Sequence, residues 1–90
     1  VEYGNIIAFL LKNNSNYAFV QKYVYSIKQI SDYVELPNEL RDEIKTFFPI
    51  VLLSQNFTVI SVNKIRHKCI VAPTDDGLCL SEIKADYDHD

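Results

Sequence analysis

A histidine and a cysteine stand two residues apart in the apolar segment 57–71. On a β-strand, residues two apart share a face, so the His67 imidazole and the Cys69 thiol would lie side by side. Catalysis by a thiol needs such a base within hydrogen-bond reach and a third group to orient the base. Asp75 or Asp76 in the next turn could be that group, but no local catalytic motif surrounds the pair. We therefore expect a core thiol beside a partly exposed imidazole, and no enzyme.

Metal ligands are sparse in the sequence. Structural zinc sites use closely spaced pairs of Cys or His, and Cys69, Cys79 and the two histidines lack that spacing. The last residues could chelate a divalent cation weakly, but such a run is more typical of a solvated acidic tail. We expect neither a metal nor another cofactor. The tail residues concerned are Asp86, Asp88, His89 and Asp90.

Lys64, Arg66 and Lys68 place a positive charge at every second position. On a strand they would stand about 6.6 Å apart on one face, which is close to the phosphate repeat along a nucleic-acid strand. The same pattern is typical of a solvated strand edge that discourages pairing with another sheet. Because the net charge of the chain is −3, we expect this basic strip to make weak or no contact with nucleic acid.

Aromatic residues dominate one face of the segment 16–27 if it forms a strand. A small core takes only one of the two faces. If the aliphatic face is inside, the rings are available to a partner, and clustered rings can surround a cation. Alternatively, the rings pack beneath a neighbouring helix. The aromatic face comprises Tyr17, Phe19, Tyr23 and Tyr25, and the opposite face Ala18, Val20 and Val24.

One helix is expected, over residues 37–48. Pro37 suits the first helical turn, acidic residues fill the N-terminal half as the helix dipole prefers, and Pro49 ends the helix. Its apolar stripe consists of Leu40, Ile44, Phe47 and Phe48.

Short strands account for most of the remaining sequence. Asn-rich residues 13–16 and the Thr-Asp-Asp-Gly turn at 74–77 predict two hairpins. We expect a mainly β (α+β) fold, in which about five strands form a small antiparallel, barrel-like sheet beside the helix. The expected strands cover 3–11, 16–27, 50–53, 57–62, 65–72 and 78–83.

Length and composition fit one small globular domain. The chain has 90 residues, of which 48% are hydrophobic and 23% charged. Two cysteines are too few for a disulfide framework, and no apolar run approaches the roughly 20 residues that cross a bilayer. We expect a single domain over 1–85 with an acidic tail at 86–90, belonging to a larger intracellular protein and not to a membrane.

The segment LSQNFTVISVNKIRHKCIV at 53–71 resembles the signature segment of BAH (bromo-adjacent homology) domains. The stretches YGNIIAFL (3–10) and YAFVQKYVY (17–25) are similar to two strands of that family, in the same order. The positions that fill the signature are Phe57, Val62, Ile65, Lys68, Cys69 and Val71.

The resemblance implies a nuclear, chromatin-associated protein-interaction module, because BAH domains are mixed β folds with that role. Some of them bind methylated histone lysines through an aromatic cage. By this resemblance Cys69 is a packing residue, and Tyr23 and Tyr25 are nearest to a cage, with Tyr17 on the same face of the peptide-binding strand. The alternative is a cytoplasmic docking or self-association domain of a mobile-element- or virus-derived protein, with the aromatic face as its contact.

Overall fold

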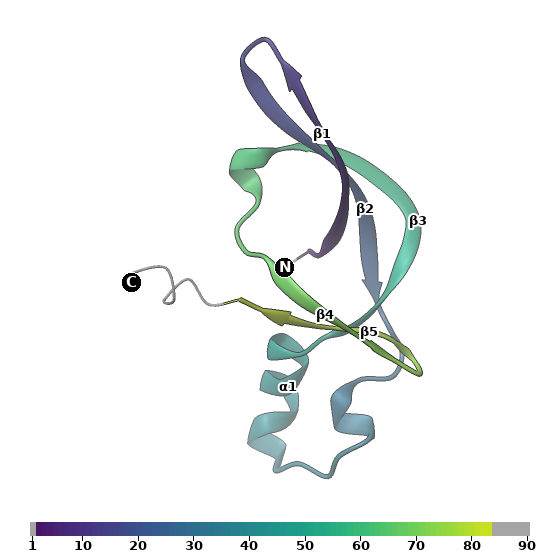
Figure 1. Cartoon of the computed structure of the whole chain (residues 1–90). Coiled ribbons are helices and arrows are strands. Elements are labelled where there is room, and N and C mark those ends of the chain that lie inside the picture. Colours follow the sequence, from purple (N-terminus) through teal and green to yellow (C-terminus); the bar gives the residue numbers. More distant parts are fainter. Residues whose placement is uncertain (1, 84–90) are drawn as a thin grey trace. The chain divides into compact units, whose positions relative to one another are not determined.

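A computed structural model describes residues 2–83 of the chain. Within these residues it contains five strands, one α-helix and two short 3-10 helices (Figure 1). The β1–β2, β3–β5 and β4–β5 pairs are antiparallel. This confirms the expected mainly β fold with about five strands and one helix. The elements are β1 (Gly4–Lys12), β2 (Ser15–Tyr25), η1 (Ile30–Asp32), α1 (Asn38–Phe47), β3 (Ile50–Ser61), η2 (Val62–Lys64), β4 (Cys69–Thr74) and β5 (Gly77–Glu82).

The chain divides into two compact units, each built from two chain segments. The first unit comprises the residues up to Val24 together with Leu52–Arg66. The second unit comprises Tyr25–Val51 and the residues from His67 onward. Strands β2 and β3 each contribute residues to both units.

The first unit begins with a tight hairpin of β1 and β2, drawn in purple and blue in Figure 1. Its two loop residues, Asn13 and Asn14, have φ values of 51° and 63°. Two-residue hairpin loops require this left-handed conformation, which asparagine tolerates better than most residues. Lys12 therefore faces Ser15, and this pairing sets the register of the hairpin.

Strand β3 continues the sheet of the first unit in the order β1-β2-β3. Ser54 is the junction: the Gln21 Nε2 donates to its carbonyl oxygen at 2.7 Å, and its own Oγ donates to the Lys22 carbonyl oxygen at 2.7 Å. Gly4 is required at the start of β1, because a Cβ there would collide with a Val20 methyl group.

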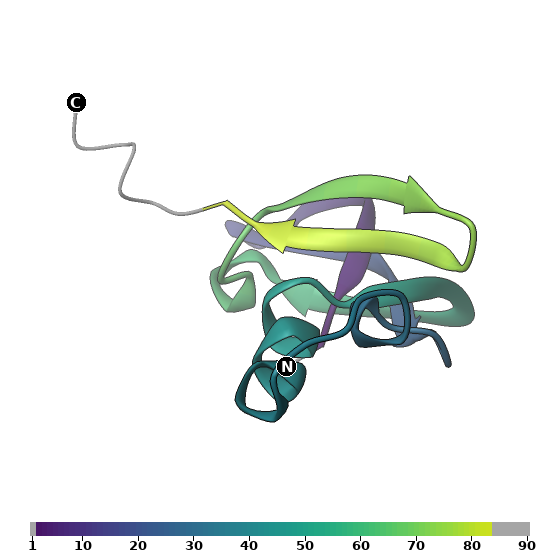
Figure 2. The same cartoon turned by 90° about the horizontal axis from the view of Figure 1, so that it is seen from below.

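The second unit contains the strand order β3-β5-β4, with Ile50 opposite Cys79 and Val51 opposite Leu78. Strands β4 and β5 form the predicted second hairpin, the green and yellow pair in Figure 2. Its turn closes at Gly77, whose φ of 144° few other residues would tolerate. The buried side chains that these strands contribute are Ile50, Val51 and Leu80.

Strand boundaries differ from the expectation in the middle of the chain. The strands predicted at 50–53 and 57–62 are one continuous strand, β3. Polar residues 54–56 had indicated a loop, but Ser54 is bonded to β2 and keeps the backbone in the sheet. The strand predicted at 65–72 starts only at Cys69. Residues 65–68 form no strand and connect β4 to η2, at whose start the Ser61 Oγ accepts a hydrogen bond from the Asn63 N–H.

Helix α1 forms within one residue of its predicted ends, with Pro37 at the N-cap. Its apolar stripe is not buried, however. Leu40, Phe47 and Phe48 are all exposed, and Ile44 is half-buried. No helix in the described part of the chain is both long and apolar enough to span a membrane.

Candidate interaction surfaces

Aromatic side chains cover one face of the sheet in the first unit. The Phe19 and Phe57 rings stack with their centroids 5.5 Å apart and their planes 18° apart. Leu10 pairs with Tyr17 across β1 and β2, and opposed residues share a face. Phe19 and Phe57 remain 38% and 48% exposed. We call this surface the aromatic platform; it consists of Leu10, Tyr17, Phe19 and Phe57.

The opposite face of β2 explains why the rings point outward. Ala18 is fully buried and Val20 is 7% exposed, so of the two alternatives that the sequence left open, the one with Ala18 and Val20 inside is the one observed. Alternation along the strand then directs Tyr17 and Phe19 to the other face. Val24 belongs to the same aliphatic face in the sequence pattern, but it is exposed. It is the last residue of β2 in the first unit.

Tyr17 and Tyr23 lie on β2 in the first unit, and both are half-buried. Six residues of strand separate their Cα atoms by about 20 Å. A cage requires rings within about 6 Å of one cation. Tyr17 and Tyr23 are therefore too far apart for one cage, and they would contact separate positions of an extended ligand.

Tyr25 belongs to the second unit and lies beside helix α1. The Lys45 ammonium stands 5.0 Å from the centroid of the Tyr25 ring, and the ring is 47% exposed. This distance is within the range of a cation–π interaction. The Tyr25 ring is therefore not buried beneath the helix, and the ammonium group of Lys45 from the same chain already lies over it.

Strand β1 is the outermost strand of the first unit. All nine of its residues are exposed, and Phe9 and Leu11 retain 69% and 67% of their accessible surface. No charged residue interrupts the sequence from Gly4 to Leu11. Natural edge strands are normally shortened, charged or covered, because an unpaired apolar edge pairs with other strands.

The basic strip does not have the predicted strand geometry. Lys64 ends η2, whereas Arg66 and Lys68 lie in the segment between η2 and β4, which is not a strand. The 6.6 Å spacing expected from a strand was therefore wrong. All three side chains are exposed. Lys64 and Arg66 belong to the first unit and Lys68 to the second.

His67 pairs with Glu82 and lies outside β4. Its Nδ1 lies 2.8 Å from a carboxylate oxygen of Glu82. Glu82 also faces Cys69 across the β4–β5 hairpin. Burial raises the pKa of the Cys69 thiol, and the negative charge of Glu82 raises it further. A thiol nucleophile needs the opposite shift, so this geometry does not activate Cys69.

The sequence analysis did not identify Glu82, although the predicted turn at 74–77 implies which residue faces Cys69. With Thr74 opposite Gly77, counting back along the hairpin brings Cys69 opposite Glu82. The other thiol, Cys79, contacts the Phe48 carbonyl oxygen at 3.9 Å, and burial raises its pKa. Both cysteines are free. Residues 2–83 contain no cluster of three or more potential metal ligands, and the acidic tail at 86–90 lies outside the described residues.

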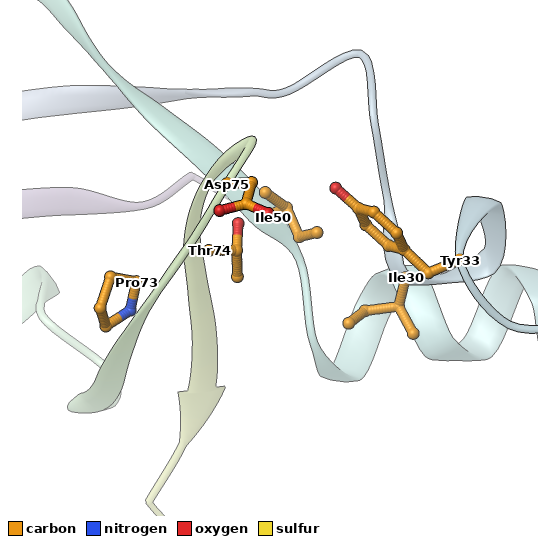
Figure 3. Close-up of a pocket in the computed structure, with 6 residues that line it drawn as sticks. All are labelled: Ile30, Tyr33, Ile50, Pro73, Thr74 and Asp75. Atoms are coloured by element: carbon orange, nitrogen blue, oxygen red, sulfur yellow. The ribbon is translucent and has the colours of Figure 1, made fainter.

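A shallow pocket of about 370 Å³ lies in the second unit (Figure 3). Ile30 and Tyr33 stand on one side, the β4–β5 turn stands on the other, and Ile50 lies between them. Apart from the turn itself, no sequence pattern indicated this pocket. Its lining residues are Ile30, Tyr33, Ile50, Pro73, Thr74 and Asp75.

Comparisons with known proteins add no relative to this geometry. No family model, no curated protein and no solved structure matches the chain.

Proposed function

We propose that the chain is a non-enzymatic protein-interaction module. The observation that supports this most directly is the aromatic platform, where two stacked phenylalanine rings stay about half exposed on an otherwise regular sheet. Exposed, contiguous apolar surface of this kind marks interaction sites in soluble proteins. Aromatic side chains also contribute a large contact area at a small cost in conformational entropy.

The partner that we propose is an extended basic peptide, such as a histone tail, in a nuclear or chromatin-associated setting. Two observations support a basic ligand: the net charge of the chain is −3, and aromatic faces attract cations. Tyr17 and Tyr23 share one face of β2 and are about 20 Å apart, which suits a peptide that runs along the strand. The resemblance to BAH domains agrees with this proposal.

Titration against an array of modified histone peptides tests the proposal. Phe57→Ala removes half of the stacked pair, and we expect it to weaken binding about tenfold or more, since burying a Phe side chain contributes about 1.5–3 kcal/mol. Phe47→Ala is the matched control, because Phe47 is 52% exposed on α1 in the second unit. Absence of binding to every peptide, or equal losses in both variants, would remove the proposal.

A second candidate function is self-association, as in a docking domain of a mobile-element- or virus-derived protein. The exposed edge of β1 favours it. Two β1 strands paired antiparallel would bring Lys12 of one copy toward the end of the other copy where Glu2 lies. Glu2 already attracts Lys22 at 3.7 Å, so opposite charges would meet at both ends of the pair.

A further inference from the structure

The pocket in the second unit has two walls, one on each side of Ile50, and hydrogen bonds hold both walls in place. The Ile50 N–H donates to the Gln29 Oε1 at 2.9 Å, and the Gln29 Nε2 donates to the Ile50 carbonyl oxygen at 2.8 Å. The Gln29 N–H in turn donates to the Asp32 carboxylate at 2.8 Å, which closes η1. The buried Gln29 side chain therefore joins Ile50 to the wall formed by Ile30 and Tyr33.

The opposite wall is the β4–β5 turn, which is held equally firmly. The Thr74 Oγ1 donates to the Gly77 carbonyl oxygen at 2.8 Å and accepts from the Asp76 N–H at 3.2 Å. The Ser26 Oγ donates to the Asp76 carbonyl oxygen at 3.0 Å. A pocket whose two walls are fixed before binding loses little conformational entropy when a ligand enters.

The residues that line the pocket are mainly apolar, and two of them carry a polar group that is available to a ligand. Ile30 and Pro73 supply aliphatic surface, and Ile50 lies fully buried between the two walls. Among the described residues, neither the Tyr33 hydroxyl nor the Asp75 carboxylate has a hydrogen-bond or ion-pair partner. The described lining includes no Lys or Arg. Tyr33 and Asp75 stand on opposite sides of Ile50 (Figure 3).

We propose that this pocket binds the side chain of a lysine or arginine from a partner peptide. Its volume of about 370 Å³ is at the lower end of the range for ligand sites, so it suits one side chain. The aliphatic stem would pack on Ile30 and Pro73, while the cationic end would meet the Asp75 carboxylate and the Tyr33 ring or hydroxyl. An acidic side chain would be repelled by Asp75.

The site is distinct from the aromatic platform, so it holds whether or not a peptide binds there. The test is an NMR titration of the full chain, labelled with ¹⁵N, against three blocked tripeptides: Ala-Lys-Ala, Ala-norleucine-Ala and Ala-Glu-Ala. Norleucine keeps the aliphatic stem and lacks the charge. We expect the lysine peptide to shift the amides of Ile30, Tyr33 and Asp75, and to bind about fivefold more tightly than the norleucine peptide.

Asp75→Asn should remove the preference for the lysine peptide over the norleucine peptide. Tyr33→Leu should also weaken binding of the lysine peptide, because it removes the aromatic ring and the hydroxyl group. Asp42→Asn is the matched control, since Asp42 is an exposed acid on α1 that does not line the pocket. Equal binding of the lysine and norleucine peptides, or an Asp75→Asn protein that retains the preference, would overturn the inference. Shifts confined to Tyr17 and Phe19 would support the proposed function and overturn the pocket site.

Discussion

The side-chain amide of Gln29 pairs with the backbone of Ile50 in both directions, as a neighbouring β-strand would. Its Nε2 also donates to the Ser26 carbonyl oxygen at 2.9 Å, and the Gln29 side chain is buried. One residue outside any strand thus bonds to both polar backbone groups of Ile50, a fully buried core residue, and the Ser26 N–H donates to the same Ile50 carbonyl oxygen at 2.9 Å.

Replacing Gln29 should destabilise the second unit. Gln29→Leu leaves the Ile50 N–H buried without a partner, while the Ile50 carbonyl oxygen keeps the hydrogen bond from the Ser26 N–H; the expected cost is about 1–3 kcal/mol in the free energy of unfolding. Urea denaturation followed by circular dichroism measures the loss. Gln55→Leu, on an exposed residue of β3, should change stability by less than about 0.5 kcal/mol. Similar stability of the two variants would show that the Gln29 hydrogen bonds contribute nothing net.

Lys45 competes with any external cation for the Tyr25 ring. Lys45→Met keeps the aliphatic stem and removes the ammonium group. Affinity for a trimethyl-lysine peptide that uses Tyr25 should then rise about two- to fivefold, which corresponds to a cation–π contribution of about 0.5–1 kcal/mol. Isothermal titration calorimetry provides the measurement, with Lys28→Met as the control. An unchanged affinity would mean that the peptide does not use the Tyr25 ring.

Glu82 should slow the alkylation of Cys69. In a Cys79→Ser background, Glu82→Gln removes the charge that contributes to the raised pKa of Cys69, so the thiolate fraction at a given alkaline pH should increase. Iodoacetamide labelling followed by mass spectrometry reports the rate. The pKa of the Cys69 thiol should fall toward its ordinary value while burial keeps it raised. A rate that does not change would rule out the electrostatic effect of Glu82.

The two raised thiol pKa values also predict how stability depends on pH. Because the folded state holds these protons more tightly than the unfolded state, their contribution is complete below the ordinary thiol pKa of 9.0 and is lost as the pH rises above it. The free energy of unfolding should therefore decline above pH 9.0 in the wild type. The decline should be smaller in a Cys69→Ser, Cys79→Ser variant, and parallel curves would contradict the assignment.

The edge of β1 should determine self-association. Phe9→Lys places a charge on the exposed strand, and we expect it to weaken any dimer about tenfold or more, because burial of a Phe side chain contributes about 1.5–3 kcal/mol. Light scattering across a concentration series measures the molar mass. Phe47→Lys makes the same chemical change on α1 and should leave the mass unchanged. A dimer that survives Phe9→Lys must use another surface.

Local chemistry in the sequence determined the hairpins, the helix and the composition of the two faces of β2. The loop residues Asn13 and Asn14 and the glycine at position 77 predict tight turns because few other residues accept positive φ. The alternation around Ala18 and Val20 separated an aliphatic from an aromatic face of β2 without deciding which is buried, and the structure buries Ala18 and Val20. These features depend on neighbours within a few residues of the chain.

Only the tertiary structure decided which distant residues meet. Phe57 reaches Phe19 from another strand, Gln29 substitutes for a strand beside Ile50, and Glu82 pairs with His67. None of these contacts has a local pattern, because each depends on strand register and on how connections of 14 to 37 residues are placed. For the same reason, the alternating charges at 64–68 indicated a strand, whereas Lys64 ends a 3-10 turn and residues 65–68 form no strand. Periodicity shows which side chains share a face, but the pairing of remote segments decides whether that face is covered.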